Sequence, residues 1–127
     1  MNESTLIRNY LAKLVKNNPS ALKLNDDVFF DKKNKVVVSS DTYVEGVHFL
    51  NFKKPDLVIK KILRSSISDL YCKGVKPKFI FIGASGNNIS FSKKNLDLIY
   101  ESLKQEQKKY KFKLSGGDTT KSNKTIF

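Results

Sequence analysis

This sequence lacks a second cysteine, an apolar run long enough to span a membrane and a secretory signal, and each absence excludes a structural feature or a compartment. A single cysteine, Cys72, cannot form an internal disulfide, which favours a reducing compartment. No apolar run approaches the roughly 20 residues that span a bilayer, and no secretory signal opens the chain. We therefore expect a cytoplasmic protein without a membrane segment. Cys72 itself is expected to be a small buried apolar residue rather than a nucleophile.

Acidic residues are also scarce: the chain has 12 Asp and Glu against 24 Lys and Arg, a net charge of +12. Such a charge invites a nucleic-acid-binding interpretation. However, the lysines are spread over the whole chain, there are only two arginines, and no known nucleic-acid module is recognisable. We therefore interpret the lysines as solvated surface residues and do not expect nucleic-acid binding. A positive field would also attract anionic nucleotides.

What is present is enough for one folded domain. The 127 residues can bury roughly two-thirds of their unfolded surface. A hydrophobic content of 39% with nine phenylalanines indicates a real core rather than disorder.

Hydrophobic periodicity and turn residues predict alternating helices and strands. The expected elements are a helix over 3–16, a hairpin of strands 28–30 and 36–40, a helix from Pro55 to Gly74, a strand over 79–84, a helix from Ser92 to Tyr110, a strand over 112–115, a loop over 116–123 and a strand from Thr125. This order predicts an α+β fold, in which helices cover one face of a four-stranded mixed or antiparallel sheet.

The stretch Val38–Leu50, V-S-S-D-T-Y-V-E-G-V-H-F-L, is the least generic part of the chain. An apolar strand runs directly into four oxygen-bearing side chains, Ser39, Ser40, Asp41 and Thr42. A carboxylate flanked by hydroxyls at a rigid strand end suits Mg²⁺, which prefers oxygen ligands and commonly bridges carboxylates to a phosphate. The alternative is an Asp-Thr turn that closes a hairpin.

Other carboxylates occupy similar positions. Asp26 and Asp27 precede a short apolar strand, Asp69 lies in the helical run S-S-I-S-D-L, and Asp118 follows two glycines in S-G-G-D-T-T. With Asp41, these are five of only 12 acidic residues, placed at element ends or among small residues. We expect Asp27, Asp41, Asp69 and Asp118 to converge on one site.

The segments N-D-D, S-S-D-T-x-V-E-G-V-H-F, S-I-S-D-L-x-x-x-G-x-x-P and G-G-D-T-T, in this order, resemble the N-terminal domain of the thiamine-monophosphate kinases. These belong to an ATP-binding superfamily that includes aminoimidazole ribonucleotide synthetase and selenophosphate synthetase. The resemblance covers nearly all of residues 3–127. It implies the N-terminal domain of the aminoimidazole ribonucleotide synthetase-like fold, and a homodimer that pairs the sheets of two copies.

The resemblance also implies the chemistry. ATP would transfer its γ-phosphate to thiamine monophosphate, with Mg²⁺ assisting and no catalytic side chain attacking. The implied metal ligands are Asp27, Ser39, Ser40, Asp41, Asp69 and Asp118. The implied ATP contacts are Gly117, Asp118 and Tyr110, and the implied substrate contact is His48. For His48, Tyr110 and Gly116–Gly117 the alternatives are, respectively, a hydrogen-bonded strand-end histidine, a core tyrosine and an ordinary turn.

Two departures from the family pattern stand out. The family usually carries Gly-x-Gly before the Asp pair, where this chain has Lys23 and Asn25, so we expect the loop to follow another path. The family also continues into a second domain beyond the position of Phe127. We therefore expect residues 1–127 to be a single ATP- and Mg²⁺-binding N-terminal domain without the C-terminal one, either a fragment or a truncated product.

Two rival hypotheses remain at this point. One is another ATP-dependent enzyme of the same superfamily, of the purine or selenophosphate synthesis type. The other is a basic, non-catalytic module that binds RNA or acidic partners, whose binding would be salt-sensitive and would survive loss of the aspartates.

Overall fold

The computed structural model describes residues 2–127, which divide into two compact units. Of these, residues 2–40 and 69–75 form the first unit, and residues 41–68 and 76–127 form the second. The structure confirms the α+β class, but its strands form two separate two-stranded sheets, β1–β2 and β3–β4, rather than the expected four-stranded sheet. No helix within residues 2–127 combines the length and apolar character that crossing a membrane requires.

The first unit begins with short helical segments instead of one long helix. Helix α1 (Glu3–Leu6) is capped by Asn2, whose Oδ1 accepts from the Thr5 amide at 2.9 Å, and it continues as the π-helical turn η1 (Ile7–Leu11). The expected helix over 3–16 was therefore too long. Tyr10 and Leu14, which were expected on its apolar stripe, are 60% and 81% exposed, so no apolar burial sustains the helix further.

The 3₁₀ segment η2 (Pro19–Leu24) leads from this turn to the strands, and its backbone is unusual. Leu22, Lys23 and Leu24 all have positive φ angles, of 50°, 59° and 57°. Left-handed conformations are unfavourable for residues with a Cβ and are the conformations that glycine adopts most easily. Lys23, where the resemblance implied a glycine, thus lies within this left-handed run.

The antiparallel hairpin of β1 (Val28–Asp31) and β2 (Val36–Ser39) was predicted correctly. Its register pairs Val28 with Ser39, which fixes Ser39 at the end of the hairpin opposite the turn. Asp31 closes the turn, since its carboxylate accepts from both the backbone amide and the side chain of Asn34, at 3.1 and 2.7 Å.

Two long helices of 18 residues dominate the second unit, α2 (Pro55–Cys72) and α3 (Lys93–Tyr110). Both were predicted. The last residues of α2, from Asp69 on, belong to the first unit. Cys72, at its end, is exposed, so the expectation of a buried cysteine was wrong. Ser92 precedes α3 with extended backbone, but its side chain makes no capping hydrogen bond.

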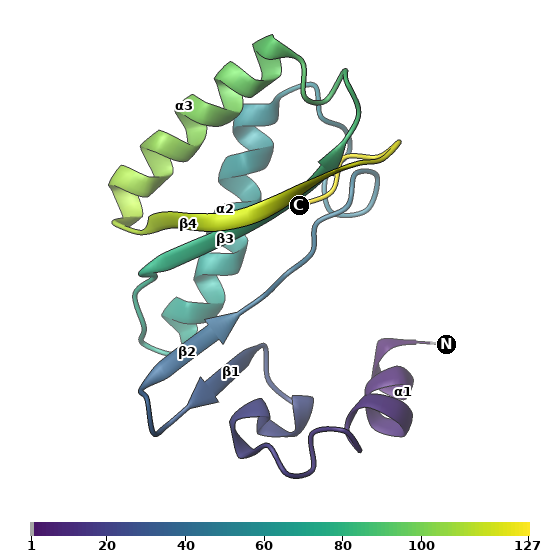
Figure 1. The fold of residues 1–127 in the computed structure, drawn as a ribbon, viewed down its shortest axis with the longest axis vertical. Helices are drawn as coiled ribbons and strands as arrows, with labels where there is room; N and C mark the ends of the chain where they lie inside the picture. Colours follow the sequence, from purple (N-terminus) through teal and green to yellow (C-terminus); the bar gives the residue numbers. More distant parts are fainter. Residues whose placement is uncertain (1) are drawn as a thin grey trace. The chain divides into compact units, whose positions relative to one another are not determined.

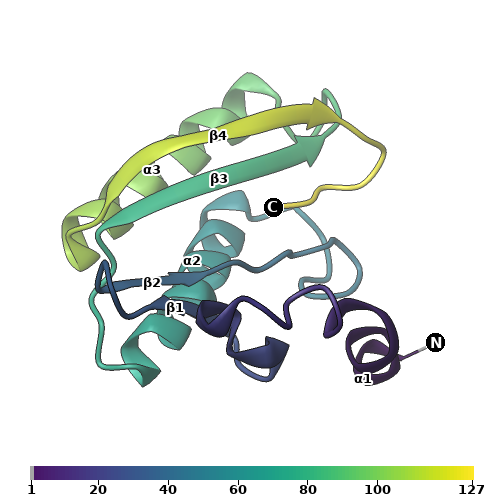
Figure 2. The same ribbon diagram turned by 60° about the horizontal axis from the view of Figure 1, so that its bottom comes forward.

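Strands β3 (Phe79–Gly86) and β4 (Lys113–Lys121) pair in parallel, as the two arrows in Figure 2 show. Parallel neighbours need a crossover connection, and α3 provides it. Because β4 continues to Lys121, the loop expected over 116–123 is mostly strand. Gly116 and Gly117 pair with Phe81 and Ile82, immediately after a register shift.

The core of this unit lies between the helices and one face of the β3–β4 pair (Figure 1). Ile80 and Ile82 face inward and pack against it. The buried members are Phe49, Phe52, Val58, Ile59, Ile62, Leu63, Ile67, Ile99 and Phe112. Those from α2 recur at three- and four-residue spacing, which explains why the periodicity predicted this helix well.

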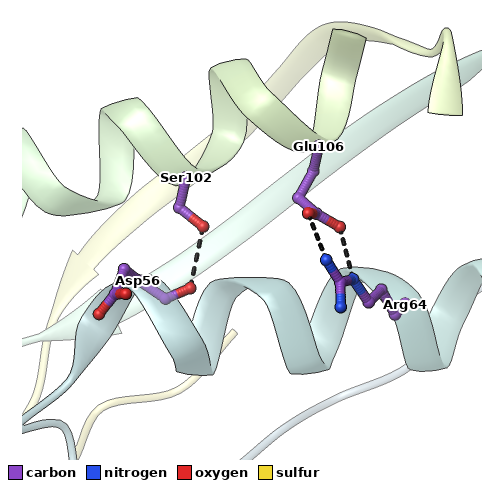
Figure 3. A network of polar contacts seen from close by, with 4 residues as sticks. All are labelled: Asp56, Arg64, Ser102 and Glu106. Carbon is purple, nitrogen blue, oxygen red and sulfur yellow. Dashed lines mark hydrogen bonds and ion pairs between the residues drawn. The ribbon is translucent and has the colours of Figure 1, made fainter. Parts of the chain in front are cut away.

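Polar contacts also join the two helices (Figure 3). Arg64 of α2 donates from Nε and Nη2 to the two carboxylate oxygens of Glu106 on α3, both at 2.8 Å. One turn away, the Ser102 hydroxyl donates to the backbone oxygen of Asp56 at 2.9 Å. The Arg64 bonds hold the pKa of Glu106 below its usual value despite the desolvation of this buried carboxylate.

Candidate functional site

The predicted site residues fall into both units, and each unit is described separately. Asp27, Ser39, Ser40 and Asp69 belong to the first unit; Asp41, His48, Tyr110, Gly117 and Asp118 belong to the second. The convergence of all four aspartates therefore stays a prediction. The exposure and hydrogen-bond partners of each side chain show which oxygen atoms are available to a ligand.

In the first unit, the structure brings Ser39 and Asp69 together across 30 residues of sequence. The Ser39 hydroxyl donates to Asp69 Oδ2 at 3.2 Å. Ser39 is held there by the hairpin register, and Asp69 by the last turns of α2. This contact links two of the predicted metal ligands and leaves Asp69 Oδ1 without a protein hydrogen bond among the described residues.

The neighbouring aspartates 26 and 27 have different surroundings. Asp26 accepts from Lys73 Nζ at 2.7 Å and from the Val28 amide at 3.3 Å, and the Lys73 bond holds the pKa of Asp26 below its usual value. Asp27 is exposed, and its carboxylate makes no hydrogen bond within residues 2–127. Of the pair, Asp27 is thus the carboxylate that remains available to a cation.

In the second unit, Asp41 is held by a tyrosine. Asp41 is exposed and its Oδ2 accepts from the Tyr43 hydroxyl at 3.1 Å. The same hydroxyl lies 3.1 Å from Ser66 Oγ on α2. Tyr43 was not among the predicted site residues, because it stands at the variable position of the motif S-S-D-T-x-V-E-G-V-H-F.

His48 lies on a tight turn that is stabilised by hydrogen bonds to the backbone of Val44. Gly46, at φ 81°, lets the chain reverse, and the amides of Val47 and His48 both donate to the Val44 oxygen. The Val44 amide in turn donates to His48 Nδ1 at 2.9 Å. Because Nδ1 accepts, the neutral ring carries its proton on Nε2. His48 thus presents an N–H donor that suits a phosphate oxygen.

Glu45, the acidic residue of V-E-G-V-H-F, has a structural contact that the sequence did not predict. Its Oε2 accepts from the amide of Thr125 at 3.1 Å, and its own amide donates to the Thr125 oxygen at 2.9 Å. Thr125 is fully buried. Glu45 therefore fastens the His48 turn to the segment after β4 and is not free to bind a ligand through that oxygen.

The G-G-D-T-T segment lies in β4, where Asp118 is exposed and its Oδ1 accepts from the Thr119 amide at 2.8 Å. Gly117 has a packing reason to be glycine. An added Cβ would lie 1.9 Å from the backbone oxygen of Ile82. Close strand approach thus requires Gly117 independently of any nucleotide contact.

Tyr110 ends α3 and packs, partly buried, against the hydrophobic core. The Lys109 Nζ lies 5.3 Å from its ring centroid. The core interpretation accounts for this position, and a nucleotide contact by Tyr110 stays a prediction.

The donor set suits a hard cation. Asp27 has a free carboxylate, and Asp41, Asp69 and Asp118 each use one oxygen within the protein and leave the other without a protein hydrogen bond among the described residues. Among residues 2–127, no group of three or more His, Cys, Asp or Glu side chains lies close enough together to hold a metal ion. In general, Mg²⁺ keeps several waters and takes phosphate oxygens as further ligands.

Comparisons with known proteins identify the family of the chain. Residues 22–127 match the family described as AIR synthase related protein, N-terminal domain. The chain is 30% identical to the thiamine-monophosphate kinase of Haemophilus influenzae and 29% identical to that of Bacillus subtilis, over 99% and 94% of its own length. It spans about two fifths of those curated relatives, 39% and 38%.

Solved structures give the same result for the fold. The chain matches AaThiL complexed with AMPPCP and TMP with a TM-score of 0.78 and 26% identity, over 99% of this chain and 41% of that one. It matches thiamine monophosphate kinase from Aquifex aeolicus with a TM-score of 0.74 and 25% identity, over the same shares of the two chains.

Proposed function

Because this chain belongs to the AIR synthase related protein family, whose N-terminal domain it matches over residues 22–127, we propose that it supplies the ATP- and Mg²⁺-binding part of a thiamine-monophosphate kinase. The reaction transfers the γ-phosphate of ATP to the phosphate of thiamine monophosphate and yields thiamine diphosphate. The names of the relatives support this reaction, as does the neighbour that was solved with AMPPCP and TMP.

One arrangement in the chain carries the proposal. Tyr43 contacts both an exposed carboxylate with a free oxygen, Asp41, and the ring of an exposed imidazole whose Nε2 is a donor, His48. The Asp41 carboxylate suits a cation, and the Nε2–H of His48 suits a phosphate oxygen. Phosphoryl transfer between two anions needs this combination, because charge neutralisation and alignment provide most of the catalysis.

We propose that Asp27, Asp41, Asp69 and Asp118 bind Mg²⁺ with the ATP phosphates, with Ser39 and Ser40 as supporting oxygens. Bound Mg²⁺ neutralises charge that develops on the transferred phosphoryl group. Gly117, Asp118 and Tyr110 are the proposed nucleotide contacts, and His48 is the proposed thiamine monophosphate contact.

The test is titration calorimetry of ATP into the 127-residue chain, with Mg²⁺ present and with Mg²⁺ removed by a chelator. We expect ATP binding that requires Mg²⁺ and that Asp41→Asn weakens. Asp97→Asn is the matched control, since Asp97 is an exposed aspartate on α3 outside the proposed site. ATP binding that is indifferent to Mg²⁺, or no binding at all, would contradict the proposal.

The same samples separate this function from the RNA-binding alternative. That alternative predicts RNA binding that falls steeply with salt and is unchanged in the aspartate variants, because lysines would carry it. Our proposal instead predicts ATP binding that depends on the aspartates and on Mg²⁺.

We also propose a homodimer through the β3–β4 sheet. Side chains alternate along a strand, so Phe79 and Phe81 lie on the face opposite the buried Ile80 and Ile82. Phe79 is 55% exposed and Phe81 is 70% exposed. Apolar surface of this kind on a sheet suits a self-complementary contact between two copies.

A further inference from the structure

Tyr43 contacts two side chains of the proposed site, yet it is not among the proposed metal, nucleotide or substrate contacts. Its hydroxyl meets Asp41 Oδ2 and Ser66 Oγ, both at 3.1 Å. Its ring lies edge-on to the His48 imidazole, with 5.7 Å between centroids and 77° between planes. All four residues belong to the second unit, so these contacts lie within one compact body.

The direction of each hydrogen bond around Tyr43 follows from the chemistry of the partners. An ionised carboxylate only accepts, so the single phenolic proton points to Asp41. The Ser66 hydroxyl must then donate to the phenolic oxygen. These two hydrogen bonds, from Ser66 to Tyr43 and from Tyr43 to Asp41, fix the orientation of the Asp41 carboxylate through Oδ2 and leave Oδ1 for another partner.

The His48 ring is fixed from two sides. The Val44 amide donates to Nδ1 and sets the tautomer, and the Tyr43 ring supports the imidazole in the edge-to-face geometry that aromatic pairs prefer. Of the two ring nitrogens, Nε2 is thus the one left to donate to a ligand.

Tyr43 can hold its neighbours because it is itself anchored. Its amide donates to the Phe127 oxygen at 2.7 Å, and its own oxygen accepts from the Phe127 amide at 3.0 Å. Its side chain packs, partly buried, against the hydrophobic core. The ring and hydroxyl therefore extend from backbone that is hydrogen-bonded to Phe127 and packed against the core.

We infer that Tyr43 is a positioning residue, which orients the Asp41 carboxylate toward the cation and holds the His48 imidazole toward the substrate phosphate. The inference rests on the proposed function for the identity of those two ligands. In this inference Tyr43 acts through its contacts with Asp41 and His48 rather than as a ligand contact itself. Groups that hold metal ligands in this way commonly affect metal affinity by about 10–100-fold.

The first test is Mg²⁺-dependent ATP binding by calorimetry in Tyr43→Phe, which keeps the ring and removes the hydroxyl. We expect the affinity to fall about tenfold, at the low end of that range. Ser66→Ala, which removes only the donor behind Tyr43, should show a smaller loss in the same direction and serves if Tyr43→Phe does not fold. Tyr100→Phe removes an exposed phenol on α3 and should change nothing.

The second test needs no nucleotide and uses the fact that His48 is the only histidine. At mildly alkaline pH an ordinary imidazole is neutral, and ¹⁵N NMR then distinguishes its two nitrogens. Wild type should show a protonated Nε2 and an unprotonated Nδ1. Tyr43→Phe should preserve that pattern. Tyr43→Leu removes the ring that holds the imidazole against the Val44 amide, so it should weaken the bond to Nδ1 and move the pattern toward the average of free histidine.

The outcomes are separable. If wild type binds no Mg²⁺-ATP, the proposed function fails, and the histidine spectrum still tests whether Tyr43 positions His48. If wild type binds and Tyr43→Phe binds equally well, Tyr43 does not position Asp41. An unchanged His48 spectrum in a folded Tyr43→Leu variant overturns the role toward His48.

Discussion

At the scale of single residues, the contact between α2 and α3 depends on Glu106. Its side chain is 2% exposed, and Arg64 satisfies both of its oxygens (Figure 3). The sequence analysis predicted both helices but not this pair, because Glu106 occupies a position of α3 that periodicity assigns to apolar residues. Its burial is tolerated because the carboxylate is paired.

Glu106→Gln should destabilise the chain by about 1–2 kcal/mol, since it replaces two charge-assisted bonds by weaker ones. Chemical denaturation at neutral pH measures this. Glu101→Gln is the control: its ion pair with Lys104, at 3.8 Å, is exposed and should contribute nothing measurable. Equal stability of the two variants would contradict the role of Glu106.

The same pair predicts a pH dependence. The folded-state pKa of Glu106 lies below its value in the unfolded chain, so this contribution is complete above the unfolded-state pKa. It is lost as pH falls through the folded-state pKa. The stability difference between wild type and Glu106→Gln should therefore shrink in acid. A stability difference between the two proteins that grows as pH falls would contradict the lowered folded-state pKa of Glu106.

At the scale of helices and strands, the sequence correctly predicted the elements that depend on local hydrophobic periodicity and residue propensity. The apolar periods of α2 and α3 and the β-branched run of β2 gave the correct elements. β4 was missed beyond Ser115, because Gly116–Gly117 followed by polar residues is typical of a turn. What makes that segment a strand is its parallel pairing with β3, which no local pattern contains.

Gly117→Ala tests that pairing. The added Cβ would lie 1.9 Å from a backbone oxygen that cannot move aside without breaking the ladder, so we expect a loss of about 3 kcal/mol. Gly83→Ala, on β3, is the control, because its Cβ would meet nothing within 4 Å. Thermal unfolding compares the two. A Gly117→Ala variant as stable as Gly83→Ala would mean that the close approach is wrong.

The left-handed run in η2 gives a prediction of the opposite sign. Lys23→Gly should raise the free energy of unfolding by up to about 1 kcal/mol, because relief of the left-handed strain exceeds the added entropy of the unfolded chain. Lys33→Gly, in the hairpin turn and without a positive φ, should lower it. If both variants lose stability, Lys23 is not strained.

The candidate site was predicted from motifs and resemblance more than from physics, and the structure refines it at particular residues. Asp26 is engaged by Lys73 whereas Asp27 is free, which the sequence N-D-D could not distinguish. Glu45 fastens a turn, and Gly117 has a packing role beside any nucleotide contact. Tyr43 was missed because it stands at the variable position of its motif, and the sequence does not show where its hydroxyl points.

At the scale of the whole molecule, the proposed dimer predicts self-association. Sedimentation equilibrium should show a monomer–dimer equilibrium, and Phe79→Ser with Phe81→Ser should weaken it at least about tenfold, since both rings would be buried in the contact. Tyr100→Ser, an equally exposed aromatic on α3, should not. A wild-type chain that stays monomeric at high micromolar concentration contradicts the dimer.

The central claim is that Asp27, Asp41, Asp69 and Asp118 bind Mg²⁺ together with ATP. Its most direct test is NMR of the ¹⁵N-labelled chain with ATP, in which a trace of Mn²⁺ replaces Mg²⁺ and broadens nearby amides. We predict that the amides of Asp27, Asp41, Asp69 and Asp118 broaden together, and that excess Mg²⁺ restores them. Broadening that spares any of the four aspartates, or broadening that excess Mg²⁺ does not reverse, would contradict the claim.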